Sequence, residues 1–595
     1  MAKTAALEAK IQEWLSWDKN DATRSEIASL QEAGDWGRLS SLLEKRMAFG
    51  TAGLRGRMGA GYACMNDLVI VQTTQGLADY LLKTVPNAAQ RGVVVGYDGR
   101  YHSRRFAELT ASIFLHLGVK VWLFAKICPT PWVAFGTRYY QAAAGIMVTA
   151  SHNPKQDNGY KVYWDNGAQI IPPHDSGIQS AIQALLEPRA TSWDTSVIGG
   201  ATDPGPELTP AYMERLSAAM RQPQMNADSP IRFTVTSMHG VSHPYMCEAF
   251  KACNFKPFIP VREQMEADPE FPTVPFPNPE EGKSALNLAM ATADAGGSTV
   301  ILANDPDADR LAVAEKQPSG EWRVFNGNET GALLGWWCWS SYPSPDDKDT
   351  CYMLASTVSS KILRSIAEKE GFHFEETLTG FKWMGNRAEQ LMLQGKKVLF
   401  AFEEAIGFMC GTTVLDKDGV SAALEVAQMA TTLANKGLSL TQQLDLIYDR
   451  YGFHTTNNSY YLCHEPEVVK RMFERIRSLG GAPGKYPTSL GGGQYRIGAV
   501  RDLTTGHDSG QPDGRAILPV SSSSQMITFT FSEPQAVLTL RTSGTEPKIK
   551  WYSEIRAQPG QTDRDAVKRQ LDALVAAMVD ELMQPEQNGL IARKE

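Results

Sequence analysis

The sequence predicts a multi-domain protein of the α/β class. A chain of 595 residues has room for roughly three to five domains. Its hydrophobic content of 43% and charged content of 21% are typical of a globular protein and not of a disordered chain. One pattern also recurs along the chain: a short apolar run, a loop rich in glycine and polar residues, and then a helical stretch. Buried strands that alternate with helices in this way indicate layered α/β units.

Four apolar runs show this pattern most clearly. In chain order, each with the loop that follows it, they are 92–96 with 97–100, 145–149 with 150–154, 298–303 with 304–310, and 397–402 with 403–407. In α/β folds, ligands bind outside the carboxyl ends of the strands. We therefore expect several α/β units to present these loops to one cleft.

Composition indicates where the domains end. Residues 203–210 are too rich in proline for a helix interior, and further boundaries are expected near 322–328 and 451–461. The last part of the chain has β-rich runs within 525–540 and closes with an amphipathic helix around 563–582. The expected domains are 1–210, which includes an N-terminal helical extension, 211–325, 326–452 and 453–595.

Charge and cysteine content narrow the class of protein. The net charge of −8 and the pI near 5.8 count against nucleic-acid binding, which needs a basic face. The most apolar stretch, residues 331–339, is far too short to cross a bilayer. The eight cysteines form no Cys-x-x-Cys motif, so free thiols in a reducing compartment are expected. We expect a cytoplasmic monomer that binds neither nucleic acid nor membranes.

An acidic loop follows the third apolar run. Asp305, Asp307 and Asp309 alternate, so three carboxylates can converge on a hard cation such as Mg²⁺ or Ca²⁺. An EF-hand also begins with alternating acids, but here Arg310 replaces its glycine and Lys316 replaces its final glutamate. A solvated acidic turn is the other alternative. The position after a buried strand favours a metal-binding loop.

A serine loop follows the second run. Ser151 lies in Thr-Ala-Ser-His-Asn-Pro, which suggests a nucleophile, although an ordinary turn closed by Asn153 and Pro154 is the competing interpretation. His152 is the next residue, and its side chain is expected to point elsewhere, so a local Ser–His pair is disfavoured. The chain has no Gly-x-Ser-x-Gly segment around this serine, which counts against a hydrolase triad.

A third loop, residues 541–548, has the composition of a phosphate cradle. It offers hydroxyl groups, an exposed glycine backbone, Arg541 and Lys548 after an apolar strand. It lacks the spacing of a Walker A loop, and a polar hairpin turn is the alternative. Weaker signals come from the glycine-rich segment 49–56 and from two lysines, Lys161 and Lys417, in loop-like contexts.

Together these segments resemble the α-D-phosphohexomutase superfamily. Its four characteristic motifs occur here in the family's order, as TASHNP (149–154), DPDADR (305–310), FEEAIG (402–407) and RTSGTEP (541–547). Residues 377–385 and 414–419 are most similar to the animal phosphopentomutase branch, also called phosphoglucomutase-2, whose near relative is glucose-1,6-bisphosphate synthase. The resemblance implies three α/β domains and a smaller α+β C-terminal domain around a central cleft.

The resemblance also implies roles for individual residues. The catalytic residues would be Ser151, which carries the phosphate, and His152, Lys161, Arg55 and Lys417. Mg²⁺ would be bound by the phosphate on Ser151 and by Asp305, Asp307 and Asp309. The sugar would contact Arg310, Thr379, Gly380, Lys382, Glu403 and Ala405. The phosphate that is not reacting would be held by Arg541, Ser543, Gly544, Thr545 and Lys548.

The implied activity is phosphate transfer within one sugar phosphate. Ribose or deoxyribose 1-phosphate would become the 5-phosphate, and glucose 1-phosphate the 6-phosphate, through a bisphosphate intermediate, with glucose 1,6-bisphosphate or ribose 1,5-bisphosphate as activator. Ala405 stands where common phosphoglucomutases have serine, and one lost sugar hydrogen bond, worth about 0.5–1.5 kcal/mol, is consistent with a preference for pentoses. The alternatives are a bisphosphate synthase recharged by 1,3-bisphosphoglycerate and, more remotely, a non-catalytic sugar-phosphate sensor.

Overall fold

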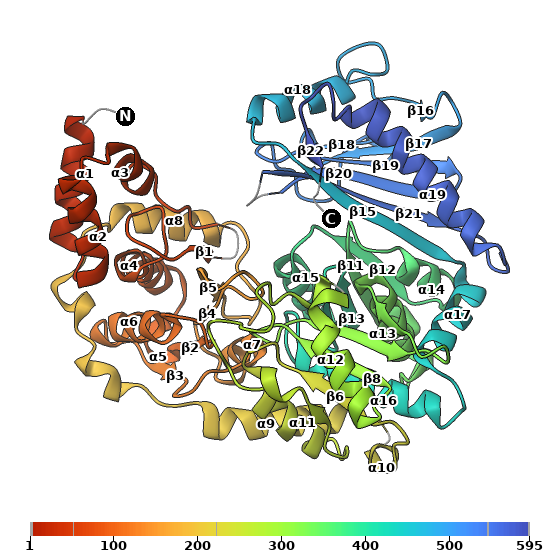
Figure 1. Ribbon diagram of the computed structural model, residues 1–595, viewed down its shortest axis with the longest axis horizontal. Helices are drawn as coiled ribbons and strands as arrows, with labels where there is room; N and C mark the ends of the chain where they lie inside the picture. Colours follow the sequence, from red (N-terminus) through yellow and green to blue (C-terminus); the bar gives the residue numbers. More distant parts are fainter. Residues whose placement is uncertain (1–3, 51–52, 222, 282, 544–546, 593–595) are drawn as a thin grey trace. The chain divides into compact units, whose positions relative to one another are not determined.

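The computed structural model describes residues 4–50, 53–221, 223–281, 283–543 and 547–592 (Figure 1). The chain forms two compact units. The first comprises Met1–Pro345, Thr350–Tyr352 and Gly380–Leu440, and the second comprises Asp346–Asp349, Met353–Thr379 and Thr441–Glu595. Within the described ranges, no helix combines the length and the apolar character that crossing a membrane requires.

Three helices precede the first sheet: α1 (Ala5–Trp17), α2 (Asp21–Glu32) and α3 (Trp36–Leu43). Each begins next to a polar side chain, Thr4, Asn20 or Asp35, that accepts a hydrogen bond from a free N–H group of the first turn. Their apolar faces enclose a small core, in which Trp14 meets Tyr62 edge to face with ring centroids 5.0 Å apart.

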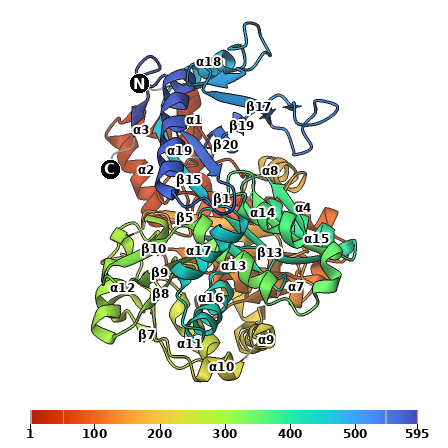
Figure 2. The same cartoon turned by 90° about the vertical axis from the view of Figure 1, so that its right-hand side faces the viewer.

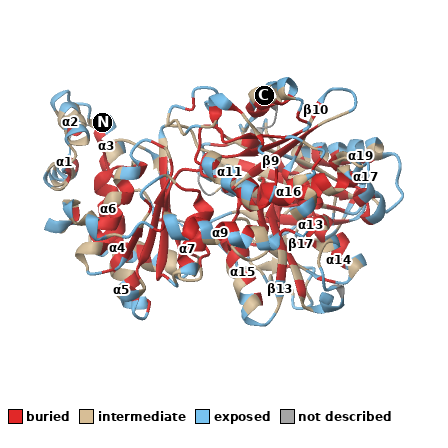
Figure 3. Cartoon of the chain, turned by 90° about the horizontal axis from the view of Figure 1, so that it is seen from below, coloured by how far each residue is buried: buried red, intermediate tan, exposed pale blue. Residues whose placement is uncertain are grey.

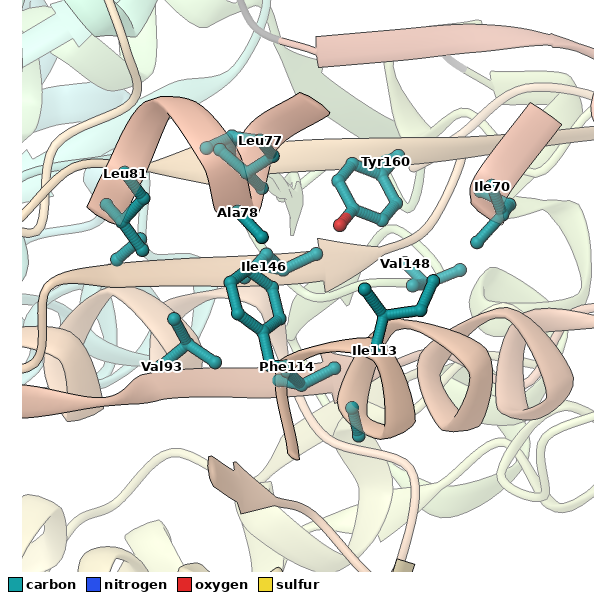
Figure 4. Close-up of a cluster of buried hydrophobic side chains, with 14 of the residues drawn as sticks. Ile70, Leu77, Ala78, Leu81, Val93, Ile113, Phe114, Ile146, Val148 and Tyr160 are labelled. Carbon is teal, nitrogen blue, oxygen red and sulfur yellow. The ribbon is translucent and has the colours of Figure 1, made fainter. Parts of the chain in front are cut away.

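The first sheet has the order β1-β5-β4-β2-β3. Its strands are β1 (Gly53–Arg57), β2 (Val93–Tyr97), β3 (Val121–Leu123), β4 (Ala144–Val148) and β5 (Asp157–Tyr163). Strand β2 is parallel to β3 and β4, whereas β5 is antiparallel to β4 and β1. Its helices are α4 (Asp67–Thr84), α5 (Ala88–Arg91), α6 (Ser103–His116), α7 (Thr130–Tyr139) and α8 (His174–Ala184). Figure 4 shows Ile146 and Val148 of β4 packed among side chains of α4 and α6, including Leu77 and Phe114.

The second sheet has the order β10-β9-β8-β6-β7. Its strands are β6 (Phe233–Thr236), β7 (Ile259–Pro260), β8 (Val300–Asn304), β9 (Leu311–Lys316) and β10 (Trp322–Phe325), and the helices are α9 (Gly205–Ala219), α10 (Pro223–Ala227), α11 (Ser242–Ala252) and α12 (Lys283–Gly296). Short 3₁₀ turns lie at Ala190–Trp193, Ser196–Gly200, Arg262–Gln264, Pro279–Glu281 and Pro345–Thr350. Every residue of β8 is buried, and so is all of β9 (labelled in Figure 3) except Lys316, so the acidic loop between them begins and ends in the core.

Helix α9 corrects one expectation from the sequence. The proline content of residues 203–210 predicts that no helix interior lies there, yet α9 begins at Gly205 and contains Pro210. Pro206 lies in the first turn, where the missing N–H has no intrahelical partner to lose. Pro210 follows one turn later, so it removes only one hydrogen bond close to the start of the helix.

The rest of the first unit contains the hairpin that precedes Lys417. Strands β13 (Lys397–Glu403) and β14 (Gly407–Cys410) pair antiparallel, with Glu403 opposite Gly407. Helices α13 (Gly327–Ser340) and α15 (Phe381–Leu393) contact β13, and α16 (Gly419–Ala434) contacts β14. The side chain of Asp418 accepts hydrogen bonds from the first turn of α16 and so fixes where that helix begins.

The second unit contains an antiparallel sheet in the order β16-β17-β19-β20-β21-β15-β22, with β18 paired to β17. Its strands are β15 (His454–Leu462), β16 (Ser489–Leu490), β17 (Tyr495–Asp502), β18 (His507–Asp508), β19 (Met526–Glu533), β20 (Ala536–Thr542), β21 (Lys548–Arg556) and β22 (Ile591–Ala592). Its helices are α18 (Pro466–Ile476) and α19 (Arg564–Met578), which continues as a π-helix over Val579–Met583. Helix α19 packs on β15 and β21 (Figure 2). Most of β11 (Cys351–Ser356), β12 (His373–Thr377), α14 (Ile362–Glu370) and most of α17 (Leu440–Tyr451) complete this unit.

The predicted α/β class is confirmed, and the four apolar runs form strands β2, β4, β8 and β13. Most of the stretch 451–461, near which a domain boundary is expected, is strand β15. The connection from α17 is confined to Gly452 and Phe453, and Gly452 has a φ of +99°, which favours glycine at this turn.

Candidate active site

The acidic loop is a buried cluster of three carboxylates. It connects β8 to β9, whose antiparallel pairing of Asn304 with Leu311 closes the loop at its base. Asp305, Asp307 and Asp309 are each at most 1% exposed, so a solvated acidic turn is excluded. One oxygen of each side chain lies within 4.8 Å of the others, an arrangement able to hold a metal ion.

The chemistry of this cluster fits Mg²⁺. Oδ1 of Asp307 and Oδ1 of Asp309 are buried and accept no hydrogen bond from the described residues. Buried oxygens without partners are costly, and hard oxygen donors are the ligands that Mg²⁺ prefers. Burial and the neighbouring Asp307 and Asp309 raise the pKa of Asp305 well above its usual value, because three carboxylates repel one another when no cation lies between them.

Ser151 lies directly against this cluster. The loop between β4 and β5 is buried at Ser151, whose Oγ donates a hydrogen bond to Oδ2 of Asp305 over 2.8 Å. The backbone of Ser151 is left-handed, with a φ of +54°. His152 does not point elsewhere, as its position in the sequence suggested, because the left-handed turn brings its Nδ1 to 3.3 Å from Ser151 Oγ. Burial and the cations Arg310 and Arg55 lower the pKa of His152, so the imidazole is neutral.

Two lysines contact the same carboxylates. Lys161 Nζ is 2.6 Å from Asp307 Oδ2 and 2.8 Å from Asp309 Oδ2, and Lys417 Nζ is 3.2 Å from Asp309 Oδ2. Burial alone would raise the pKa of Asp307, but the ammonium of Lys161 holds it below its usual value. Lys161 is expected in a loop but belongs to strand β5. The strand can pass close to Thr149 because residue 159 is glycine, and a Cβ there would lie 2.4 Å from the Thr149 carbonyl oxygen.

Hydrogen bonds from Arg310 connect the acidic loop to residues 403–407, called the Glu403 loop. Arg310 donates from its backbone to Asp305 Oδ1 and from Nη1 to the carbonyl oxygen of Ala405, at 3.0 and 2.7 Å. Glu403 accepts a hydrogen bond from the backbone N–H of Gly380. Burial and the neighbouring Glu404 raise the pKa of Glu403 to about 7.

The remaining expected residues are more widely distributed. Lys382 lies in the first turn of α15, where burial lowers the pKa of its ammonium group to about 8. Arg55 lies on β1 and donates to Asn153 Oδ1 over 3.3 Å. The second unit contains Thr379 and the ends of the loop expected to bind phosphate, where the backbone N–H of Ser543 donates to the Lys548 carbonyl oxygen. Arg541 lies on β20, while Gly544 and Thr545 are outside the described residues.

Several residues of this cluster were not predicted from the sequence. Thr130, at the start of α7, donates from Oγ1 to Asp307 Oδ2 over 2.6 Å. Oδ1 of Asp416 is 3.3 Å from Lys417 Nζ, and Nη2 of Arg100 donates a hydrogen bond to the carbonyl oxygen of Ser151. Arg100 had a signal because it closes the polar loop after the first apolar run, and Asp416 because it lies in the segment 414–419 that carries the family resemblance. Thr130 had none, because it reaches the site through tertiary packing that no local pattern records.

Comparison with known proteins agrees with this fold. Sequence profiles described as phosphoglucomutase/phosphomannomutase, alpha/beta/alpha domains I, II and III match residues 46–189, 210–320 and 326–451. The chain is 53% identical to "Phosphopentomutase" of Homo sapiens, with 99% of this chain and 98% of that one covered. It is 50% identical to "Glucose 1,6-bisphosphate synthase" of Homo sapiens (99% and 96%) and 42% identical to "Probable phosphoribomutase" of Schizosaccharomyces pombe (98% and 99%).

Solved structures share the fold at lower identity. A putative phosphomannomutase from Thermus thermophilus gives a TM-score of 0.65 at 22% identity, covering 91% of this chain and 99% of that one. The phosphoglucomutase parafusin from Paramecium gives 0.64 at 16% identity, covering 93% and 97%. With the profiles matching most of its length and full-length relatives at about half identity, the chain belongs to the phosphoglucomutase/phosphomannomutase family of the α-D-phosphohexomutase superfamily.

Proposed function

We propose that this protein is a sugar-phosphate mutase that moves phosphate between position 1 and position 5 or 6 of one sugar through phospho-Ser151. The observation that carries the proposal is the hydrogen bond from Ser151 Oγ to Asp305, one of three buried carboxylates. Relatives named phosphopentomutase and phosphoribomutase, at 41–53% identity over nearly the whole chain, support it. The favoured substrates are ribose and deoxyribose 1-phosphate, with glucose 1-phosphate as a further one.

The reaction proceeds in two phosphoryl transfers. A sugar hydroxyl oxygen attacks phosphorus on Ser151, the bond from phosphorus to Oγ breaks, and the sugar becomes a bisphosphate. Ser151 Oγ then attacks phosphorus of the other phosphate, the bond from that phosphorus to the sugar oxygen breaks, and the sugar monophosphate leaves. In each transfer the attacking hydroxyl loses a proton and the leaving oxygen gains one. His152 Nδ1 lies 3.3 Å from Ser151 Oγ, and Lys161 and Lys417 contact Asp309, so these three residues are proposed to move the protons.

Charge compensation is the main physical task of this site. A phosphoserine adds about −1.5 to −2 charges beside three carboxylates, a repulsion that Lys161 and Lys417 offset in part. Asp305, Asp307 and Asp309, with a phosphate oxygen on Ser151, would hold Mg²⁺, which when bound supplies further positive charge at the reacting phosphate. The protein's own part is to orient Ser151 and to keep water from the phosphoserine.

The sugar and the second phosphate have separate candidate residues. Glu403, Gly380, Lys382, Arg310 and Ala405 are proposed to contact the sugar. The phosphate that is not reacting is proposed to bind the loop of Arg541, Ser543, Gly544, Thr545 and Lys548. A bound bisphosphate, either glucose 1,6-bisphosphate or ribose 1,5-bisphosphate, is proposed as activator because it can recharge Ser151. We place the activity in the cytoplasm.

The proposal is tested by intact-mass measurement after incubation with glucose 1,6-bisphosphate and Mg²⁺. Wild-type protein should gain one phosphoryl group and Ser151→Ala should gain none. Turnover of ribose, deoxyribose and glucose 1-phosphates then ranks the substrates. An unmodified wild-type chain without turnover would instead fit a sugar-phosphate sensor and reject the mutase.

A second activity, synthesis of glucose 1,6-bisphosphate, is favoured by the relatives of that name at 49–50% identity. The same serine and aspartates serve both reactions, and only the phosphate donor differs. Incubation of glucose 1-phosphate with 1,3-bisphosphoglycerate decides between them. Bisphosphate that accumulates faster than the 6-phosphate would make the synthase the principal activity.

A further inference from the structure

A buried arginine outside the proposed reaction gathers the backbone of the Ser151 loop. Arg100 lies between β2 and α6, and its side chain is only 1% exposed. Its Nη2 donates to the carbonyl oxygens of Ser151 and Asn153, both at 2.6 Å. Its Nη1 donates to the carbonyl oxygens of Pro154 and Asp157, at 2.9 and 3.3 Å. One guanidinium group therefore contacts four carbonyl groups, three in the loop that holds Ser151 and one at Asp157, the first residue of β5.

Asp98 fixes this arginine and the other end of the same loop. Oδ1 of Asp98 accepts the backbone N–H of Arg100, and Oδ2 forms an ion pair with Arg100 Nε at 3.2 Å. Oδ2 also accepts a hydrogen bond from Thr149 Oγ1 over 2.7 Å, and Thr149 Oγ1 in turn accepts the backbone N–H of Ser151. The backbone of Ser151 is thus held on both sides, its N–H through Asp98 and its carbonyl through Arg100.

Two residues of the segment between β7 and α12, Glu270 and Phe271, cover this arrangement. The ring of Phe271, which is buried, lies 5.0 Å from the guanidinium carbon of Arg100. Glu270 next to it accepts hydrogen bonds from Tyr101 Oη and from Lys155 Nζ of the loop that holds Ser151. The side chain of Arg100 is only 1% exposed, so water has little access to replace the four donated hydrogen bonds.

We propose that Arg100, oriented by Asp98, is the positioning residue that aims Ser151 Oγ at Asp305. The proposal rests on the mutase function of Ser151. A left-handed backbone is unfavourable for serine, so it persists only where the surroundings impose it, and here the surroundings are four carbonyl bonds to one cation. The planar fork of arginine can reach both pairs of carbonyl oxygens at once, which the single point charge of a lysine cannot do.

Arg100 thereby determines whether the phosphate on Ser151 is transferred to the sugar or to water. With the loop aimed correctly, phospho-Ser151 transfers its phosphate to a sugar hydroxyl. With the loop released, in-line alignment to the sugar is lost and water competes. A water oxygen then bonds to phosphorus, the bond from phosphorus to Ser151 Oγ breaks, Oγ regains a proton and inorganic phosphate leaves.

The test compares full-length Arg100→Lys with wild type and with the control variant Arg104→Lys. Arg104 lies in the first turn of the following helix, α6, and its side chain is 72% exposed. Each protein is labelled on Ser151 with glucose 1,6-bisphosphate, and the label is followed into sugar phosphate and into inorganic phosphate. For Arg100→Lys we expect kcat to fall by about tenfold or more with KM changed little, and the fraction released to water to rise several-fold. Arg104→Lys should match wild type.

A purely structural role predicts something different. It would lower the amount of folded enzyme but leave the ratio of water to sugar transfer unchanged, and that result overturns the proposal. Hydrogen–deuterium exchange of residues 149–158 gives a readout independent of activity. Faster exchange confined to this loop in Arg100→Lys supports the positioning role, and exchange equal to wild type rejects it. If wild-type protein takes no phosphate at all, the mutase function fails, while the exchange result still judges whether Arg100 holds the loop.

Discussion

The hydroxyl of Tyr163 donates a hydrogen bond to Oδ2 of Asp416 over 2.8 Å and so ties strand β5 to the residue before Lys417. Gln169 donates to the same oxygen at 2.7 Å, while Oδ1 of Asp416 faces Lys417 Nζ at 3.3 Å. Lys161 lies two residues before Tyr163 on the same strand. The two lysines that contact Asp309 are therefore held by one buried connection.

Replacing Tyr163 with phenylalanine should loosen Lys417 without removing a charge. A hydrogen bond to a charged group is worth about 1.5–3 kcal/mol, so we expect kcat to fall by roughly tenfold while KM changes little. The control is Tyr160→Phe on the same strand, β5, which loses a buried hydroxyl contact with Thr74 of α4 in the core. Both variants should lower the melting temperature, and only Tyr163→Phe should lower kcat. Equal kcat values in the two variants would contradict a role for Asp416 in holding Lys417.

Magnesium should stabilise the folded protein through the acidic loop. A ligand that binds only the native state raises its stability, and Mg²⁺ would relieve the repulsion among Asp305, Asp307 and Asp309. We expect the melting temperature of wild type to rise with added Mg²⁺ and to fall again with a chelator. Asp307→Asn should abolish this shift. Asp294→Asn, which alters an exposed ion pair with Lys316, should retain it. A shift that survives in Asp307→Asn would place the ion elsewhere.

The sequence allowed much of this site to be predicted, for identifiable reasons. Ser151 and the three aspartates follow buried strands directly, β4 of the first sheet and β8 of the second, and ligands of α/β folds bind outside the carboxyl ends of such strands. Arg100, Thr130 and Asp416 could not be assigned, because their partners lie 51 to 253 residues away or arise from packing between layers.

The departures from expectation have the same origin. Pro210 is tolerated in α9 because it costs one hydrogen bond near the helix start, a positional effect that composition does not show. Lys161 lies in a strand because Gly159 permits close approach to Thr149, and His152 turns toward Ser151 because the loop is left-handed there. In both cases backbone geometry imposed by neighbours overrides the local pattern.

The ionisation of Glu403 should appear in the pH dependence of activity. Burial raises the pKa of this carboxyl group to about 7, so it is protonated below that pH and accepts hydrogen bonds poorly. If Glu403 binds sugar hydroxyls as a carboxylate, kcat/KM should rise as the pH increases through about 7. Glu403→Gln should lower kcat/KM and remove this rise, whereas Glu321→Gln, at an exposed turn, should keep it. A profile unchanged in Glu403→Gln would show that another group titrates.

The same shift fixes the sign of an effect on stability. Because the folded-state pKa lies above that of the unfolded chain, the contribution of Glu403 is fully present below about pH 4.5 and is lost as the pH rises to about 7. Glu403→Gln carries no such group. As the pH rises from about 4.5 to 7.5, the unfolding free energy of wild type should therefore fall relative to that of Glu403→Gln. Denaturant titrations of both proteins at these two pH values measure the change.

Gly327 offers a steric test of the Glu403 loop. It is the first residue of α13, whose start is fixed by reciprocal hydrogen bonds between Asn326 and Glu329. A Cβ at Gly327 would lie 1.8 Å from the carbonyl oxygen of Glu404, so Gly327→Ala must push that loop away from the helix. Overpacking of this kind costs about 1–3 kcal/mol, and the displaced backbone carries both Glu403 and the Ala405 carbonyl that Arg310 binds. We expect a lower melting temperature and a kcat/KM reduced by tenfold or more. Gly199→Ala is the matched control, because a Cβ there meets nothing within 4 Å and its activity should equal wild type. Normal kcat/KM in Gly327→Ala would mean that the loop can shift without losing the sugar, and that Glu403 does not set the sugar's position.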